Sequence, residues 1–213
     1  MNAFIFDLDG TLIDSLEDLA DALNFMLAER GYPRQPLEML PKFIGDGVHK
    51  LVERALPPDA LEEANLQDCV AAYQTYYETT WDKKTKPYAG MPETLAELRQ
   101  RGFKLGVLSN KPHVFTVKCC TRFFPPGTFD AAFGQRSNVP RKPDPAGAFE
   151  ILRQFGLAAK DSFYVGDSGI DMALAKSAGM PAVGVLWGFR GEAELRENGA
   201  QHVICRPEEL LAL

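Results

Sequence analysis

Short apolar runs that alternate with helical patterns set the organisation of this chain. Aromatic and β-branched residues form brief uninterrupted runs that close at polar residues or glycine, which is typical of buried strands. Between them, residues 92–102, 145–156 and 171–179 space their apolar positions as helices do and end in glycine. Strand alternating with helix predicts an α/β fold, a three-layer α/β/α core with a parallel sheet covered on both faces. The predicted strands are 3–8, 104–109, 129–134, 162–167, 182–187 and, at an edge, 202–205.

Residues 16–82 break this alternation. They contain no convincing strand, and their apolar residues recur at intervals of three and four, which predicts helices. A charged segment with proline and glycine follows at 83–90 and is suited to a linker. We therefore expect a core domain made of residues 1–15 and 83–213, interrupted by an α-helical cap domain over 16–82.

Composition narrows the class of protein. With 213 residues and 46% hydrophobic side chains, the chain has enough apolar surface for a sizeable core. A net charge of −6 supplies no broad basic face, so neither a nucleic acid nor a membrane surface is expected as a partner. No apolar run reaches the ~20 residues of a membrane span, and no signal peptide is visible, which favours a cytoplasmic protein. The four cysteines and three histidines show no metal-site spacing and favour buried thiols, and the oligomeric state is not set by the sequence.

Polar side chains gather where the predicted strands end. In parallel sheets, ligands bind beyond the carboxyl ends of the strands, where the loops converge. Several carboxylates without histidine or cysteine suit a hard, oxygen-preferring cation, and Mg²⁺ is the ion that leaves room for a phosphate oxygen. The residues expected at this rim are Asp7, Asp9, Ser109, Asn110, Lys142, Asp167 and Asp171.

These residue types suit phosphoryl transfer. Asp7 is placed to attack phosphorus once a cation offsets the charge repulsion, and Asp9, two residues on, to move the proton of the leaving oxygen. Ser109 and the amide of Asn110 are donors for phosphoryl oxygens, and Lys142 balances the negative charge of the transition state. The expected substrate is a small phosphorylated metabolite.

Four segments, FIFDLDGTLIDS, VLSNKP, the lysine of VPRKPDP and YVGDSGIDMALAKSAG, resemble in this order the four motifs of the haloacid dehalogenase-like hydrolases. The resemblance covers nearly the whole chain and implies a Rossmann-like core, an inserted helical cap and an aspartyl-phosphate intermediate. It implies that Asp7 is the nucleophile, and that Asp9 is the acid and base and binds the metal through its carbonyl. It also implies that Asp167 completes a Mg²⁺ site with support from Asp171. The phosphate-binding positions of the family fall on Ser109 and Lys142.

The cap segment 43–56, FIGDGVHKLVERAL, is the candidate for substrate selection. Gly45 and Gly47 flank Asp46 directly before a helix, so backbone N–H groups there are suited to an anionic substrate end. A plain turn between two cap helices is the alternative. His49 is either a contact to the leaving group or part of a solvated helix face.

This segment, together with SNKP and GQRSNVPRKPDP, resembles the phosphoglycolate phosphatase branch of the superfamily. Phosphoglycolate is therefore the leading candidate substrate. Two alternatives stay open, namely a phosphomutase of the β-phosphoglucomutase type and a non-catalytic binding protein on the same scaffold. Phosphate release from small phosphorylated metabolites distinguishes them.

Overall fold

A six-stranded parallel sheet forms the centre of the computed structural model, which describes residues 1–62 and 65–213. The strand order is β5-β4-β1-β6-β7-β8, and every neighbouring pair is parallel. The predicted α/β fold is confirmed, and the sixth predicted strand is an edge strand. The strands are β1 (Ala3–Phe6), β4 (Lys104–Pro112), β5 (Ala131–Gln135), β6 (Ser162–Gly166), β7 (Ala182–Val185) and β8 (His202–Ile204).

The sheet belongs to one of two compact units into which the chain divides. This core unit comprises Met1–Asp14 and Pro87–Leu213, and the helical unit comprises Ser15–Lys86. Two short strands, β2 (Ile13–Asp14) and β3 (Lys86–Pro87), form a separate two-stranded sheet.

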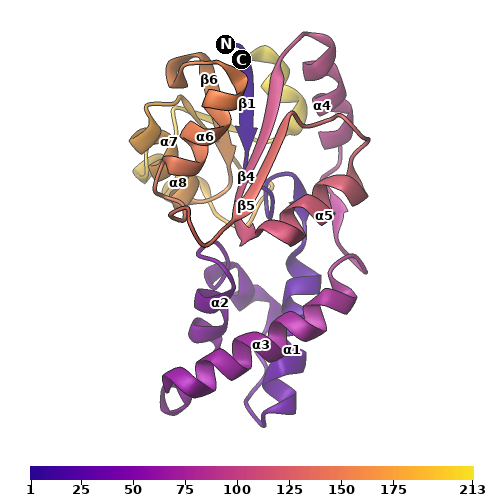
Figure 1. The fold of residues 1–213 in the computed structure, drawn as a ribbon, viewed down its shortest axis with the longest axis vertical. Helices are drawn as coiled ribbons and strands as arrows, with labels where there is room; N and C mark the ends of the chain where they lie inside the picture. Colours follow the sequence, from indigo (N-terminus) through magenta and orange to yellow (C-terminus); the bar gives the residue numbers. More distant parts are fainter. The chain divides into compact units, whose positions relative to one another are not determined.

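Helices cover both faces of the large sheet. Figure 1 shows α4 (Met91–Gln100) and α5 (His113–Phe123) on one side, and α6 (Ala146–Phe155), α7 (Gly169–Ala178) and α8 (Glu192–Glu197) on the other. Alternate strand residues point to opposite faces, so Ile5 and Tyr164 pack with Ile151 of α6 and Leu174 of α7. Short 3₁₀ turns lie at Ala159–Asp161 and Pro207–Ala212.

Two α-helices of the core unit escape the sequence prediction. Helix α5 is rich in β-branched residues and cysteine, which weakens the helical signal, and α8 is only 6 residues long. The thiols of Cys69, Cys119 and Cys120 are buried as expected, whereas Cys205 is exposed because it follows the edge strand β8.

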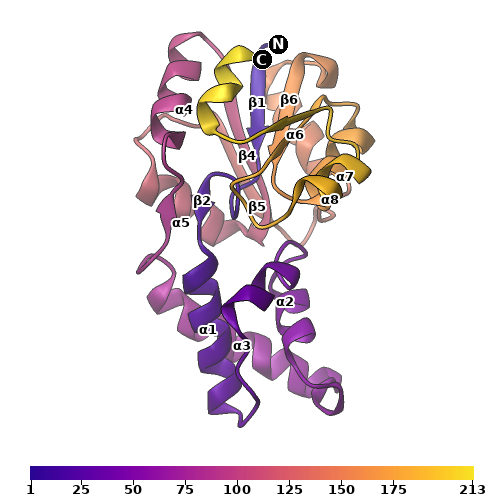
Figure 2. The same ribbon diagram turned by 180° about the vertical axis from the view of Figure 1, so that it is seen from behind.

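The helical unit is built from α1 (Leu16–Glu29), α2 (Val48–Ala55) and α3 (Glu63–Thr80), with 3₁₀ turns at Leu37–Lys42 and Pro58–Ala60. Helix α3 packs against both α1 and α2 (Figure 2). Buried Asp18 of α1 accepts hydrogen bonds from the backbone N–H groups of Lys84 and Thr85, which ties the end of the unit to its first helix. Among the described residues, none of the helices is both long enough and apolar enough to cross a membrane.

Candidate active site

The parallel sheet brings distant parts of the chain to one edge of the core unit. Asp7 follows β1, and its N–H bonds to the carbonyl of Val165 in the neighbouring strand β6. Asp167 follows the end of β6, while Ser109 and Asn110 lie near the end of β4. Because parallel strands end at the same side of a sheet, these side chains converge as the sequence predicts.

A buried ammonium links two of the carboxylates. The Nζ atom of Lys142 lies 2.8 Å from Oδ1 of Asp7 and 2.7 Å from Oδ1 of Asp171. The side chain of Lys142 is only 3% exposed and that of Asp171 is 0% exposed. Burial alone would lower the pKa of Lys142, but the charges of Asp171 and Asp7 outweigh it and raise the pKa well above its ordinary value. Lys142 therefore carries its charge throughout the physiological range.

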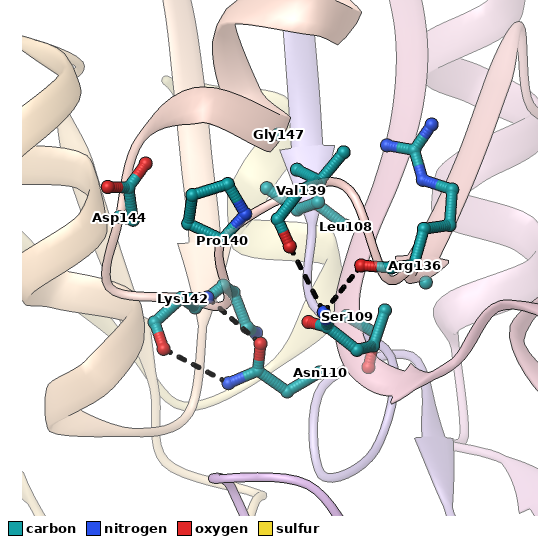
Figure 3. Close-up of a pocket in the computed structure, with 11 residues that line it drawn as sticks. Leu108, Ser109, Asn110, Arg136, Val139, Pro140, Lys142, Asp144 and Gly147 are labelled. Carbon is teal, nitrogen blue, oxygen red and sulfur yellow. Dashed lines mark hydrogen bonds between the residues drawn. The ribbon is translucent and has the colours of Figure 1, made fainter.

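Asn110 fixes the backbone that carries this lysine. Its Oδ1 accepts from the N–H of Lys142 at 2.9 Å, and its Nδ2 donates to the carbonyl of Lys142 at 3.2 Å (Figure 3). Ser109 is buried beside it, and its Oγ accepts from the N–H of Lys111 at 3.2 Å. These three predicted phosphate-site residues, Ser109, Asn110 and Lys142, also line a small pocket with Pro140 (Figure 3).

Asp167 is held from three directions. Its Oδ1 accepts from the hydroxyl of Thr11 at 3.0 Å, and its Oδ2 accepts from the N–H of Phe189 at 2.8 Å. Gly10 lies against the same carboxylate, and a Cβ atom at that position would come within 2.4 Å of Oδ2. The φ of Gly10 is 84°, which side chains rarely adopt, so both conformation and space require glycine there. Gly10 and Thr11, which follow Asp9, thus fix the position of the Asp167 carboxylate, which lies 156 residues beyond Thr11 in the sequence.

Asp171 occupies the first turn of α7, where it forms a capping box with Ser168. Its Oδ2 accepts from the N–H of Ser168 at 3.1 Å and from the hydroxyl of the same residue at 2.6 Å. Its Oδ1 accepts from Lys142. Asp171 is therefore fixed by its own helix and orients the buried lysine.

The carboxylates of Asp7, Asp167 and Asp171 form a group suited to a metal ion. One oxygen from each lies within 4.8 Å of the others. Burial, opposed by Lys142 and reinforced by Asp171, raises the pKa of Asp7 from 3.8 to about 7. Burial and then the charges of Asp171 and Asp7 raise the pKa of Asp167 from 3.8 to about 8. The donor atoms are all oxygens, and without a cation the carboxyls tend to keep their protons. Such a set fits a divalent cation such as Mg²⁺, whose charge would stabilise the ionised carboxylates.

Asp9 is half-buried and has a partner that sequence reasoning missed. The Nζ atom of Lys111 lies 3.0 Å from its Oδ1 and 3.1 Å from its Oδ2. Lys111 directly follows Ser109 and Asn110 in SNKP, so its position beside the predicted phosphate site was the available signal.

A second missed segment is the loop after β7. The indole N–H of Trp187 donates to the carbonyl of Thr11 at 2.9 Å, and Phe189 donates to Asp167. A Cβ atom at Gly188 would lie 2.3 Å from both the Cβ of Asp167 and the carbonyl oxygen of Gly10. The loop therefore packs directly against Asp167. No local sequence pattern indicates this contact.

The predicted specificity residues lie in the helical unit. Gly45 and Gly47 adopt φ values of 122° and 86°, and Gly47 is the residue before α2. The carboxylate of Asp46 pairs with the guanidinium of Arg54, which also donates to the carbonyl of Phe43. His49 lies 3.9 Å from the carboxylate of Glu53, one helical turn on. These contacts brace the loop within its own unit.

Comparisons with known proteins show the family of the chain. A family model described as haloacid dehalogenase-like hydrolase matches residues 4–185. Phosphoglycolate phosphatase of Pseudomonas syringae pv. syringae is 35% identical over 94% of this chain and 75% of its own length. Phosphoglycolate phosphatase of Aquifex aeolicus is 33% identical over 100% of this chain and 96% of its own. The crystal structure of a predicted phosphoglycolate phosphatase from Haemophilus somnus is 28% identical with a TM-score of 0.90, covering 100% of this chain and 97% of that one.

Fold, site and likeness together define a phosphoric monoester hydrolase. The chain belongs to the haloacid dehalogenase-like hydrolases, and within them it is similar to the phosphoglycolate phosphatases.

Proposed function

We propose that the chain is a Mg²⁺-dependent phosphatase that hydrolyses a small phosphomonoester through an aspartyl-phosphate on Asp7, with phosphoglycolate as the leading substrate. The observation that carries the proposal is the buried arrangement of Asp7, Lys142 and Asp171 beside Asp167. The names of the relatives support the choice of phosphoglycolate. We place this activity in the cytoplasm.

In the first half-reaction, a carboxylate oxygen of Asp7 attacks phosphorus while the bond from phosphorus to the ester oxygen breaks. Asp9 gives a proton to that departing oxygen, so that an alcohol leaves rather than an alkoxide. Ser109 and the N–H of Asn110 donate to the phosphoryl oxygens, and the ammonium of Lys142 balances their charge.

In the second half-reaction, Asp9 acts as a base instead of an acid. Asp9 takes a proton from water as the water oxygen attacks the phosphorus of the aspartyl-phosphate. The bond between phosphorus and Asp7 breaks, which releases inorganic phosphate and restores the carboxylate. Lys142 keeps its contact with Asp171 in this scheme and so stays aligned between the two steps.

The residues that would hold Mg²⁺ are Asp7, Asp167 and the backbone carbonyl of Asp9, with Asp171 in a supporting position. When bound, the ion supplies positive charge that offsets the repulsion between the carboxylates and the phosphoryl group. Thr11 and the N–H of Phe189 orient Asp167 for this role.

The loop formed by Gly45, Asp46 and Gly47, with His49, is our candidate for recognising the part of the substrate beyond the phosphoryl group. Positive φ angles at both glycines turn the backbone sharply before α2. The ion pair of Asp46 with Arg54 fixes that turn.

Phosphate release from a panel of small phosphorylated metabolites tests the function. We expect magnesium-dependent hydrolysis with phosphoglycolate among the preferred substrates, and no activity in excess EDTA. Asp7→Asn is the matched control, since it keeps the shape of the side chain and removes the nucleophile. Phosphate release that is unaffected by EDTA, or retained by Asp7→Asn, would refute the mechanism.

A further inference from the structure

Tyr164 is a fully buried polar side chain that the mechanism above does not use. It lies in the middle of β6 and is 0% exposed. Its hydroxyl donates to the carbonyl of Leu108 in β4 at 3.1 Å. Strand β1 lies between β6 and β4 in the sheet, so the side chain reaches across a whole strand to make this bond. A phenylalanine would fill the same apolar space, so the hydroxyl serves something other than packing.

The carbonyl of Leu108 lies where β4 leaves the regular sheet. The pairing of β4 with β1 ends at Val107 opposite Phe6, and its register with β5 shifts after Leu108. The next residue is Ser109, the proposed donor to a phosphoryl oxygen. A carbonyl and the N–H that follows it belong to one planar peptide group. A hydrogen bond to Leu108 therefore also orients the backbone that enters Ser109.

The same hydroxyl lies beside the carboxylate that holds the buried lysine. Its oxygen is 3.4 Å from Oδ1 of Asp171, and that Oδ1 accepts from Nζ of Lys142 at 2.7 Å. The ammonium also lies 6.0 Å from the centre of the Tyr164 ring. A hydroxyl has one proton, and the shorter distance assigns it mainly to Leu108. Because Ser168 already engages Oδ2 of Asp171, any shift of Oδ1 moves the ammonium of Lys142.

We propose, on the basis of the proposed function, that Tyr164 is a positioning residue for phosphoryl transfer. Its hydroxyl couples the peptide before Ser109 to the carboxylate of Asp171, and through that carboxylate it acts on Lys142. Two groups proposed to stabilise the phosphoryl charge are thereby held at a fixed spacing. Loss of the hydroxyl leaves the buried carbonyl of Leu108 without this donor, so the peptide relaxes. The phosphoryl group still binds, but the charge of its transition state is met less well.

The test compares Tyr164→Phe with Tyr32→Phe, which removes a half-buried hydroxyl that accepts from Nδ2 of Asn65 at 3.1 Å in the helical unit. Both are measured in Mg²⁺ on the ester that the wild type hydrolyses best. An interaction realised only in the transition state changes kcat without KM, so Tyr164→Phe should lose about 10-fold in kcat and keep KM within about 2-fold. Tyr32→Phe should keep both. Orthovanadate, which adopts the five-coordinate geometry of phosphoryl transfer, should inhibit Tyr164→Phe about 10-fold more weakly, and inorganic phosphate less than about 3-fold more weakly.

Unchanged kinetics in Tyr164→Phe, with or without a lower Tm, would overturn the proposal, as would equal losses in affinity for vanadate and phosphate. A measurement on the wild type covers the case in which the variant fails to fold. With ¹³C at Cζ of tyrosine, a hydroxyl held by Leu108 exchanges slowly and gives separate O–H and O–D signals for Tyr164 in mixed H₂O and D₂O. A single averaged signal would contradict the proposal. Failure of the phosphatase function has a separate signature, which is that the wild type releases no phosphate from any ester in Mg²⁺.

Discussion

Removing the charge of Asp167 should change how the stability of the metal-free protein depends on pH. The pKa of this carboxyl is raised from 3.8 to about 8 by burial and by the charges of Asp171 and Asp7. Between these values the folded protein keeps a proton that the unfolded chain has lost. The free energy of unfolding therefore falls as pH rises through this window.

The magnitude follows from the window. For one such proton, the free energy of unfolding falls by about 1.4 kcal/mol for each unit that the pH rises within this window. The window ends near the folded pKa, so the wild type should lose roughly 3 kcal/mol between pH 6 and pH 9 from Asp167 alone. Asp167→Asn should be nearly free of this loss, because an amide does not titrate. The amide also fits the site, since its oxygen can accept from Phe189 while its NH₂ group donates to the hydroxyl of Thr11.

Urea unfolding in EDTA at several pH values between 6 and 9 measures the difference. Asp7, whose pKa is raised to about 7, is present in both proteins and contributes a loss of its own to each, so the difference between the two profiles reports mainly on Asp167. Saturating Mg²⁺ should flatten the profile of the wild type more than that of Asp167→Asn, because the variant lacks one of the carboxylates that would bind the ion. Parallel profiles for the two proteins in EDTA would show that the pKa of Asp167 is not raised in the folded protein, and would refute this reasoning.

Three further variants examine other parts of the site. Gly188→Ala places a methyl group against Asp167 and should weaken Mg²⁺ binding about tenfold or more by calorimetry, whereas Gly191→Ala, whose Cβ meets nothing within 4 Å, should not; equal affinities would contradict the packing argument. Asp7→Asn should lose turnover by several orders of magnitude while its circular dichroism stays native, and near wild-type activity would exclude Asp7 as the nucleophile. Asp9→Asn should be impaired more severely on alkyl phosphates than on p-nitrophenyl phosphate, because a poor leaving group needs the proton more; a uniform penalty would argue against its role as acid.

Much of this site could be predicted because its residues are tied to strand ends. A short apolar run ends at or just before each of Asp7, Ser109 and Asp167. Because the strands pair in parallel, their carboxyl ends lie at the same edge of the sheet. The ends of α6 and α7 could be predicted as well, since Gly156 and Gly179 take the left-handed conformation that stops a helix.

The rest depends on pairings that no local pattern encodes. Lys111 and Asp9 are 102 residues apart, and Asp167 receives its N–H donor from Phe189, 22 residues on in another loop. A lysine or a backbone N–H is compatible with almost any surface position, so only the folded arrangement assigns its partner. Helix α5 was missed for a different reason, because its β-branched residues favour a strand over a helix locally, and packing against β5 overrides that preference.

The balance of buried charge explains why such a site is compatible with a stable fold. Asp7, Asp167 and Asp171 bring three carboxylates together, and Lys142 supplies one ammonium to them. Full ionisation would leave two negative charges uncompensated in a buried setting, and the raised pKa values of Asp7 and Asp167 are the response of the protein without metal. A divalent cation carries the charge that is missing, whereas a monovalent one would leave a buried anion. Binding of Mg²⁺ should therefore release protons near neutral pH, and proton release that is absent at pH 7 would mean that the two carboxyls are already ionised.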